Sequence, residues 1–295
     1  MVCLTAFILS ALVADPLVPG NHTRSVMFEQ KARSYLVHVP EAYDGKTIVP
    51  VVLALHGFAQ PAGTMPSFTG LNELAEKERF LVVYPSGTGF PVRWNSGGFR
   101  GQSGDDVGYI RAVLDDLAAV ANVDRKRVYA TGMSNGAMMC YRLAAELSDR
   151  IAAIAPVAGT MAITNAQPAH SVPVIHFHGT EDSMVGYEGP GRDLPAGMTF
   201  MSVEDSVRIW AGLNGCQETP TGTAFLPDTN NQDGCTVEKT VYGPGRDGSE
   251  VVLYTVRGGG HTWPGRKAPR FLGGSTLDID ASSMMWEFFQ KHPRQ

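Results

Sequence analysis

The stretch ATGMSNGA, residues 130–137, contains the pattern Gly-x-Ser-x-Gly and places Ser134 between two glycines. A strand is predicted before it, over the β-branched and aromatic residues 127–131, and a helix after it, over residues 136–147. A serine on a sharp strand-to-helix turn is typical of a nucleophile elbow. Glycines permit such a turn because they carry no Cβ atom. The pattern predicts a nucleophilic serine, and a merely structural turn is the alternative.

A serine hydroxyl needs a base to become a nucleophile, and the base needs an acid to orient it. In a chain with this elbow the acid and then the histidine follow the serine. Asp182 comes after the apolar residues 172–177, and His261 comes after residues 251–256 and three glycines. We therefore predict Ser134, His261 and Asp182 as a catalytic triad, with Glu181 as the competing acid.

The oxyanion of an acyl-transfer reaction needs two hydrogen-bond donors. The residue after the nucleophile, Asn135, would supply one backbone N–H at a helix N-terminus, which favours negative charge. The second is assigned to the N–H of Phe58, which follows His56 and Gly57 at the end of the apolar residues 51–55.

Aromatic side chains near these residues could bind the substrate. Phe58 and Trp263 flank the predicted site and could contact an aromatic acyl group or a polyester chain. Trp94 and Tyr187 are further candidates, and the Gly/Pro-rich residues 187–197 are expected to form a long loop over the site. Simple loop packing is the alternative for these aromatic residues.

His176 and His178 form a His-x-His pair on one face of a predicted strand, a spacing that can hold a metal. No third ligand is evident, so we expect no metal site and no cofactor. His178 is expected to brace the loop that carries the predicted acid, Asp182. His56 is expected to be structural.

The elements that would position these residues follow from hydrophobic patterning. Strands are predicted over 26–29, 34–39, 51–55, 80–84, 127–131, 151–157, 172–177 and 251–256, and helices over 71–77, 105–120, 136–147, 202–213 and 278–289. Alternating strands and helices indicate an α/β fold with a mostly parallel central sheet and helices on both faces. Ligands bind such sheets at the carboxyl ends of the strands. We predict one catalytic domain over residues 21–295.

The chain has 295 residues, of which 43% are hydrophobic and 18% charged, and a formal net charge of −5. It has no basic patch of the kind that binds nucleic acid. The apolar residues 1–14 are too short to span a bilayer, so we expect no stable membrane insertion. They resemble the hydrophobic region of a signal peptide cleaved after Ala14, with an N-terminal core strand as the alternative. Residues 1–20 are therefore predicted to be a signal-like N-terminal segment outside the catalytic domain, and the protein is expected to be secreted or periplasmic.

Cys216 and Cys235 flank the polar residues 217–234. We expect a disulfide between them, which would contribute about 3 kcal/mol and would agree with an exported protein. Cys140 is expected to be a small core residue, and Cys3 lies in the signal-like segment.

The chain resembles the family of feruloyl esterases and poly(3-hydroxybutyrate) depolymerases, which are secreted α/β-hydrolases. The matching stretches are YLVHVP (35–40), LHG (55–57), VVYP (82–85), WN (94–95), DDVG (105–108), RVYATGMSNG (127–136), IAPVAG (154–159), HGTED (178–182), LNGC (213–216), GGGHTWP (258–264) and WEFF (286–289). The resemblance implies the same triad and supports the disulfide. At residues 58–60 and at Gly186 the chain departs from the family, and its Gly57-Phe58 pair is similar to that of cutinases and polyester hydrolases.

The function predicted from these features is a serine carboxylic-ester hydrolase that forms an acyl-enzyme on Ser134. Its substrate would be a small-molecule or polymeric ester, first of all an aryl ester of the feruloyl type. A short-chain polyester is the alternative substrate, and a peptidase is a further alternative. A non-catalytic binding protein on a hydrolase scaffold is the alternative of another class.

Overall fold

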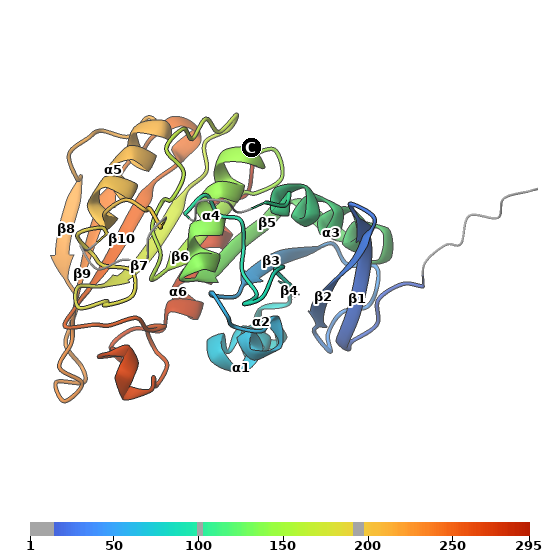
Figure 1. Cartoon of the computed structure of the whole chain (residues 1–295), viewed down its shortest axis with the longest axis horizontal. Coiled ribbons are helices and arrows are strands. Elements are labelled where there is room, and N and C mark those ends of the chain that lie inside the picture. Colours follow the sequence, from blue (N-terminus) through green and yellow to red (C-terminus); the bar gives the residue numbers. More distant parts are fainter. Residues whose placement is uncertain (1–14, 99–102, 191–197) are drawn as a thin grey trace, which may run out of the picture.

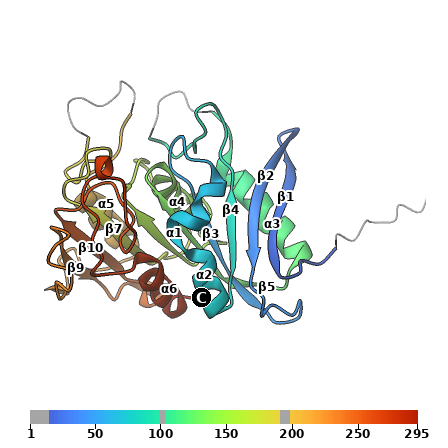
Figure 2. The same cartoon turned by 90° about the horizontal axis from the view of Figure 1, so that it is seen from below.

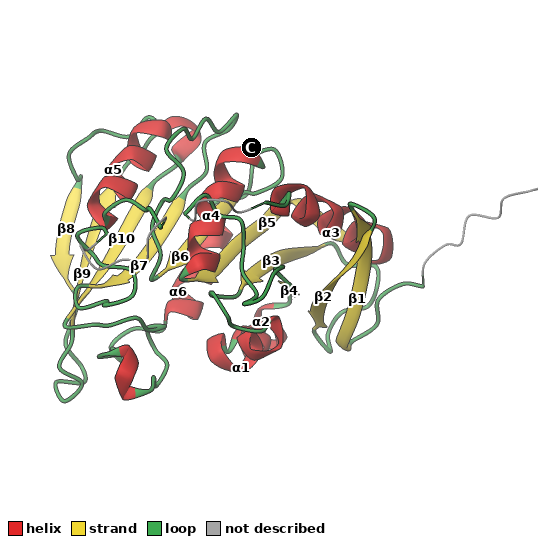
Figure 3. Cartoon of the chain, viewed as in Figure 1, coloured by secondary structure: helices red, strands yellow, loops and turns green. Residues whose placement is uncertain are grey.

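Apolar stretches of the sequence form one ten-stranded sheet, with the strand order β1-β2-β4-β3-β5-β6-β7-β10-β9-β8 (Figure 3). The computed structural model describes residues 15–98, 103–190 and 198–295. The strands are β1 Gly20–Phe28, β2 Lys31–Val39, β3 Val49–Leu55, β4 Leu81–Pro85, β5 Val123–Met133, β6 Ala153–Val157, β7 Val174–Gly179, β8 Gly222–Phe225, β9 Thr236–Tyr242 and β10 Val251–Arg257.

The middle of the sheet is parallel. Parallel pairing joins β4, β3, β5, β6, β7 and β10 in that order. Antiparallel strands extend the two edges, β2 and β1 beside β4, and β9 and β8 beside β10. Strands β3, β4, β6 and β7 are buried along their whole length, as expected for parallel strands covered on both faces.

Helices cover both faces of the sheet, which confirms the predicted fold class. They are α1 Met65–Thr69, α2 Leu71–Glu78, α3 Asp106–Val120, α4 Asn135–Glu146, α5 Val203–Leu213 and α6 Ala281–Lys291, with short 3-10 helices at Ala62–Thr64, Arg246–Gly248 and Arg270–Leu272. Helices α3, α4 and α5 pack in one hydrophobic cluster and lie in front of the sheet in Figure 1. Helices α1, α2 and α6 belong to the cluster on the other face, and α2 and α6 lie beside each other in Figure 2.

Three helices begin at side chains that accept a backbone N–H. Asp105 accepts from Gly108 at the start of α3, Ser202 from Asp205 at α5, and Asp280 from Ser283 at α6. Asp and Ser are favoured at this position because they satisfy one of the unpaired N–H groups of the first turn. The helix starts predicted from the sequence near residues 105 and 202 are therefore confirmed.

The expected disulfide is wrong, because Cys216 and Cys235 are both free in the structure. Cys216 packs in the cluster with α5 and lies near Ser249, whereas Cys235 packs in the cluster on the opposite face, directly before β9. The length of β9 separates them, roughly 20 Å at about 3.3 Å per residue. A disulfide requires Cα atoms about 4.4–6.8 Å apart. The polar segment between them is held by pairing of β8 with β9 instead.

The signal-like residues 1–14, with Cys3, lie outside the described residues. Leu17 is buried in the core cluster and its N–H donates to the Val120 carbonyl at 2.8 Å. The packed chain therefore begins before the expected boundary at residue 20. In the part of the chain that the structure describes, no helix is long and apolar enough to cross a membrane.

Candidate active site

Ser134 lies between β5, which ends at Met133, and α4, which begins at Asn135. Its φ of 58° and ψ of −119° form a conformation that non-glycine residues rarely adopt. Such strain typically costs about 1–3 kcal/mol and persists only where the surroundings fix it. Here the Ser134 N–H donates to the Val157 carbonyl at 2.9 Å, and the Ser134 carbonyl accepts from the Met138 N–H at 3.0 Å.

The two glycines of the elbow are required by close contacts between backbones. A Cβ atom on Gly136 would lie 2.2 Å from the carbonyl oxygen of Leu55, and one on Gly132 would lie 2.6 Å from the carbonyl carbon of Gly136. Strand β3 and helix α4 therefore approach too closely for any side chain at these positions. The Gly-x-Ser-x-Gly pattern has a steric cause in this fold.

Asp182 and His261 form a buried hydrogen-bonded pair beside this elbow. The Nδ1 of His261 lies 2.8 Å from Oδ2 of Asp182. Oδ1 of Asp182 accepts the backbone N–H groups of Met184 at 2.9 Å and Val185 at 2.8 Å. A carboxylate only accepts, so Nδ1 of His261 carries the proton and Nε2 of the neutral ring can take another. The competing acid, Glu181, is exposed and contributes its backbone N–H to Gly259.

Strands β5, β7 and β10 bring the three predicted triad residues to one edge of the sheet. Ser134 and His261 line the same cavity, and Asp182 lies behind His261 with an exposed fraction of 5%. Among the described residues the Ser134 hydroxyl makes no hydrogen bond. Contacts between nucleophile and base are often long without substrate, so this arrangement remains compatible with base catalysis.

Asn135 is held in a fixed orientation at the start of α4. Its Oδ1 accepts from the Trp94 N–H at 2.7 Å, and its Nδ2 donates to the Ser96 hydroxyl at 2.9 Å. As the first residue of the helix, it has a backbone N–H that no residue of the helix can accept. Phe58 lines the cavity of Ser134, and a Cβ atom on Gly57 would lie 3.5 Å from Ser134 Cβ.

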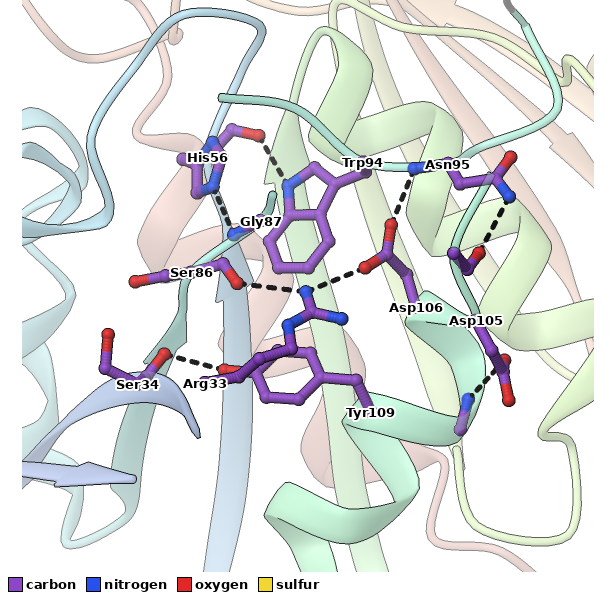
Figure 4. A network of polar contacts seen from close by, with 12 residues as sticks. Arg33, Ser34, His56, Ser86, Gly87, Trp94, Asn95, Asp105, Asp106 and Tyr109 are labelled. Carbon is purple, nitrogen blue, oxygen red and sulfur yellow. Dashed lines mark hydrogen bonds and ion pairs between the residues drawn. The ribbon is translucent and has the colours of Figure 1, made fainter. Parts of the chain in front are cut away.

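A network of buried polar contacts supports the loop with Phe58 (Figure 4). Nδ1 of His56 donates to the Gly57 carbonyl at 2.8 Å, and its Nε2 accepts from the Gly87 N–H at 2.9 Å. Burial lowers the pKa of His56, which keeps the ring neutral for this pair of contacts. The indole N–H of Trp94 donates to the His56 carbonyl at 2.9 Å. His56 thus lies under the loop, in keeping with a structural role.

The same network continues to a buried ion pair. Nη2 of Arg33 lies 2.7 Å from Oδ1 of Asp106, and the other oxygen of Asp106 accepts from the Asn95 N–H at 2.7 Å. The Arg33 guanidinium also lies 3.5 Å from the centre of the Tyr109 ring. Strand β2 and helix α3 thereby fix the segment of Trp94 that holds Asn135 (Figure 4).

The cavity next to Ser134 has a volume of about 580 Å³ and is mainly apolar. Its lining residues are Gly57, Phe58, Gln60, Phe68, Met133, Ser134, Asn135, Met138, Met184, Val185, Met198, His261 and Leu272. The methionines of this lining were not predicted from the sequence as site residues. Their positions could have been noticed, because Met133 and Met138 flank the elbow and Met184 follows Asp182.

A family model described as Esterase PHB depolymerase matches residues 33–187, more than half of the chain. The chain belongs to this esterase family. The resemblance predicted from the sequence is thus confirmed, and the protein is an ester hydrolase by family.

Relatives support this membership. The esterase is 32% identical over 262 residues to NocK of Nocardia uniformis subsp. tsuyamanensis, a protein provisionally named an esterase, and the match covers 83% of this chain and 75% of NocK. It is 30% identical over 238 residues to Feruloyl esterase B of Piromyces equi, with 78% of this chain but only 42% of that protein covered. The acetyl xylan esterase from Aspergillus awamori shares the fold, with a TM-score of 0.65 at 19% identity over 91% of this chain and 99% of that one.

Three of the four aromatic residues expected to contact substrate lie elsewhere in this esterase. Trp94 and Trp263 are buried, with 0% and 1% exposed. The indole N–H of Trp263 donates to the Ser282 hydroxyl at 3.1 Å, and its ring packs against Phe68, which lines the cavity. Both tryptophans lie behind the residues that line the cavity, and of the four predicted aromatic residues Phe58 alone lines it.

Tyr187 lies in a different place from the one expected. Its hydroxyl is 2.8 Å from that of Thr255, and it lines a separate polar cavity of about 630 Å³ beside α5 and β8–β10. The loop expected over residues 187–197 falls partly outside the described residues.

His176 and His178 form a hydrogen bond with each other, and Nε2 of His176 lies 3.1 Å from Nδ1 of His178. Within residues 15–98, 103–190 and 198–295, no group of three or more His, Cys, Asp or Glu side chains could hold a metal ion.

Proposed function

We propose that this esterase hydrolyses carboxylic esters with Ser134 as nucleophile, His261 as general base and Asp182 as the orienting acid. The Ser134 Oγ attacks the ester carbonyl and Nε2 of His261 takes its proton. The tetrahedral oxyanion is stabilised by the backbone N–H groups of Asn135 and Phe58. The protonated His261 then donates to the leaving alcohol, and a water activated by the same imidazole releases the acid from Ser134.

The geometry of the His261–Asp182 pair supports these roles. A carboxylate bonded to Nδ1 leaves Nε2 as the only basic atom of the ring, and that atom belongs to a side chain lining the cavity of Ser134. Burial of Asp182 also excludes water, which strengthens the attraction of its charge for the imidazolium formed in the reaction.

We propose an aryl ester of the feruloyl type as the substrate, and the apolar cavity beside Ser134 is the main support for this class. Its volume of about 580 Å³ and its phenylalanine and methionine lining suit a planar aromatic acyl group. Thioether sulfurs make favourable contacts with aromatic rings and adapt to their shape. The relationship to Feruloyl esterase B points to the same class.

A short-chain polyester is a second candidate substrate, and one observation favours it. Phe58 and Met184 line the cavity and are 44% and 47% exposed, and Phe271, next to the lining residue Leu272, is 75% exposed. These side chains would give an apolar rim for a polymer chain. The family model named for polyhydroxybutyrate depolymerase agrees with this reading.

We also propose that the protein is exported, to the periplasm or out of the cell. The signal-like composition of residues 1–14 supports export. Mass spectrometry of the mature N-terminus from the native host would test it, and a chain that still begins at Met1 would contradict it.

Replacement of Ser134 by alanine tests the mechanism. We expect Ser134→Ala to reduce turnover of p-nitrophenyl acetate and methyl ferulate by at least about 10³-fold, because loss of a nucleophile leaves only binding and oxyanion stabilisation. The variant should still be folded and should show a cooperative unfolding transition in urea. A fluorophosphonate should label Ser134 in the unmodified enzyme.

Turnover retained by Ser134→Ala would reject the assignment of the nucleophile. An unmodified protein that binds these esters without hydrolysing any of them would instead favour the non-catalytic scaffold. Comparing methyl ferulate with hydroxybutyrate oligomers separates the two proposed substrate classes.

A further inference from the structure

A chain of buried hydrogen bonds runs from helix α4 to the loop that carries Asp182. The Tyr141 hydroxyl lies 2.8 Å from Nδ1 of His176. Nε2 of His176 lies 3.1 Å from Nδ1 of His178, and Nε2 of His178 lies 2.8 Å from the carbonyl oxygen of Val185. All three side chains are at most 1% exposed, and none lines the cavity of Ser134.

The chemistry of its last acceptor fixes the direction of this chain. A carbonyl oxygen only accepts, so Nε2 of His178 must carry a proton. In a neutral ring Nδ1 of His178 then accepts, which requires a proton on Nε2 of His176. Nδ1 of His176 in turn accepts from the Tyr141 hydroxyl. Burial lowers the pKa of both histidines, so the neutral forms that this order requires are the stable ones.

His178 also contacts the carboxylate that orients His261. Its Nε2 lies 3.4 Å from Oδ2 of Asp182, the oxygen that is 2.8 Å from Nδ1 of His261. Val185, whose carbonyl accepts from His178, gives its own N–H to the other oxygen of Asp182 at 2.8 Å. The His178 N–H therefore donates to a backbone oxygen of this turn, and a carboxylate oxygen of the same turn lies 3.4 Å from the same nitrogen.

We propose that His178 is a positioning residue that holds Asp182 toward His261, and that Tyr141 and His176 fix the tautomer in which its N–H faces the acid turn. This rests on the roles proposed for Ser134, His261 and Asp182. In the other tautomer a lone pair of His178 would face two oxygens, and repulsion would open the turn. The N–H also takes up part of the negative charge on Oδ2, so it limits how strongly Asp182 attracts a proton onto His261.

Few ionisable groups of the described residues surround His178. His176 faces it from the same strand, Asp182 and Tyr187 from the loop that follows, and His261 from the segment after β10. Tyr141 faces the far side of His176. Removing the His178 N–H should therefore act mainly on the Asp182–His261 pair.

A matched pair of variants tests the positioning role. His178→Gln can keep an N–H near the position of Nε2, whereas His178→Leu has none. We expect His178→Leu to lower kcat/KM about tenfold or more and to move the acid limb of its pH profile upward by about half a unit, because Asp182 becomes more basic. His178→Gln should keep the acid limb of the unmodified enzyme. Identical profiles for the two variants would overturn the proposal.

Nitrogen NMR of the histidine rings tests the tautomers without relying on activity or on a variant that must fold. We expect ¹⁵N shifts of the unmodified protein to show His176 and His178 neutral and protonated at Nε2 from about pH 5 to pH 8. A proton on Nδ1 of either ring, or titration of His178 in that range, would contradict the proposed order.

Tyr141→Phe tests the first hydrogen bond of this series, which joins Tyr141 to His176. It should reduce kcat/KM several-fold and shift the acid limb in the same direction as His178→Leu. Tyr129→Phe is the control, because the Tyr129 hydroxyl is also buried but has no hydrogen-bond partner among the described residues. Equal effects of the two substitutions on the pH profile would refute a role for Tyr141.

The outcomes also separate this proposal from the proposed function. An active Ser134→Ala variant would reject the triad itself. An inactive Ser134→Ala variant together with equal pH profiles for His178→Gln and His178→Leu would reject only the positioning role.

Discussion

At the scale of single residues, Phe58 has two separable parts. Its backbone is the proposed second donor to the oxyanion, and its ring lines the cavity with an exposed fraction of 44%. A substitution that removes the ring leaves the N–H in place. Phe58 is therefore the residue at which acyl specificity can be tested without removing the oxyanion donor.

We predict that Phe58→Ala lowers kcat/KM for methyl ferulate several-fold more than for p-nitrophenyl acetate. An aromatic pair contributes about 0.5–1.5 kcal/mol beyond its buried area, whereas an acetyl group is too small to use the ring. Steady-state kinetics on both esters measures the difference.

Phe225→Ala is the matched control, because Phe225 in β8 is 62% exposed and does not line the cavity. It should leave both soluble substrates unchanged. If Phe58→Ala affects the two esters equally, the ring does not contact the acyl group, and the preference for aryl esters loses its main support.

At the scale of elements, the elbow depends on the close approach of α4 to β3. Gly136 lies in the first turn of α4, where an added Cβ would meet the carbonyl oxygens of Leu55 at 2.2 Å and His56 at 2.6 Å. Both contacts are with backbone atoms, which cannot move without displacing β3. Gly212, in α5, differs because an added Cβ there has nothing within 4 Å.

We predict that Gly136→Ala destabilises the protein by more than about 3 kcal/mol or prevents folding, as overpacking against a rigid backbone does. Gly212→Ala should instead stabilise it by roughly 0.5–1 kcal/mol, because alanine has the higher helix propensity. Urea unfolding of both variants measures these changes. A Gly136→Ala variant as stable as the unmodified protein would show that α4 can move away from β3.

At the scale of the whole molecule, three buried histidines link folding to pH. His56 lies below the loop that carries Phe58, and His176 and His178 connect α4 to the loop that carries Asp182. Burial lowers the pKa of each below the value of about 6.5 that is usual for histidine. In the unfolded chain these rings take up protons below about pH 6.5, whereas in the folded protein they stay neutral.

We predict that the free energy of unfolding is insensitive to these groups above about pH 7 and falls as the pH drops below about 6.5. The unfolded state then binds more protons than the native state, so stability rises with pH in that window. Each buried histidine contributes up to about 1.4 kcal/mol per pH unit. Urea unfolding at pH 7.5, 6.5 and 5.5 measures the slope, with His170→Gln at an exposed position as the control.

Stability that stays constant from pH 6.5 to about pH 5 would contradict this prediction. It would mean that the histidines are protonated in the native protein as well, which the hydrogen bonds of His56 and of the Tyr141 chain do not accommodate.

The parallel sheet, the elbow and the order of the proposed triad could be predicted from the sequence. These features depend on local signals: apolar strands such as β3, glycines at 132 and 136, and capping residues such as Asp105 and Ser202. Parallel strands carry the residues after them to one edge of the sheet, so Asp182 and His261 could be assigned from their place after β7 and β10.

The surroundings of those residues, in contrast, depend on how distant segments pack in the folded protein. Trp263 follows His261 closely in the chain, yet it is buried in the core, as is Trp94. Methionines from separate segments form part of the cavity wall. Cys216 and Cys235 flank one segment yet lie on opposite faces of the sheet. Strand β8 is exposed along its length and is held by pairing with β9 rather than by an apolar pattern of its own. Burial and contact depend on segments distant in the chain, and the local pattern of a sequence carries no record of which segments will meet.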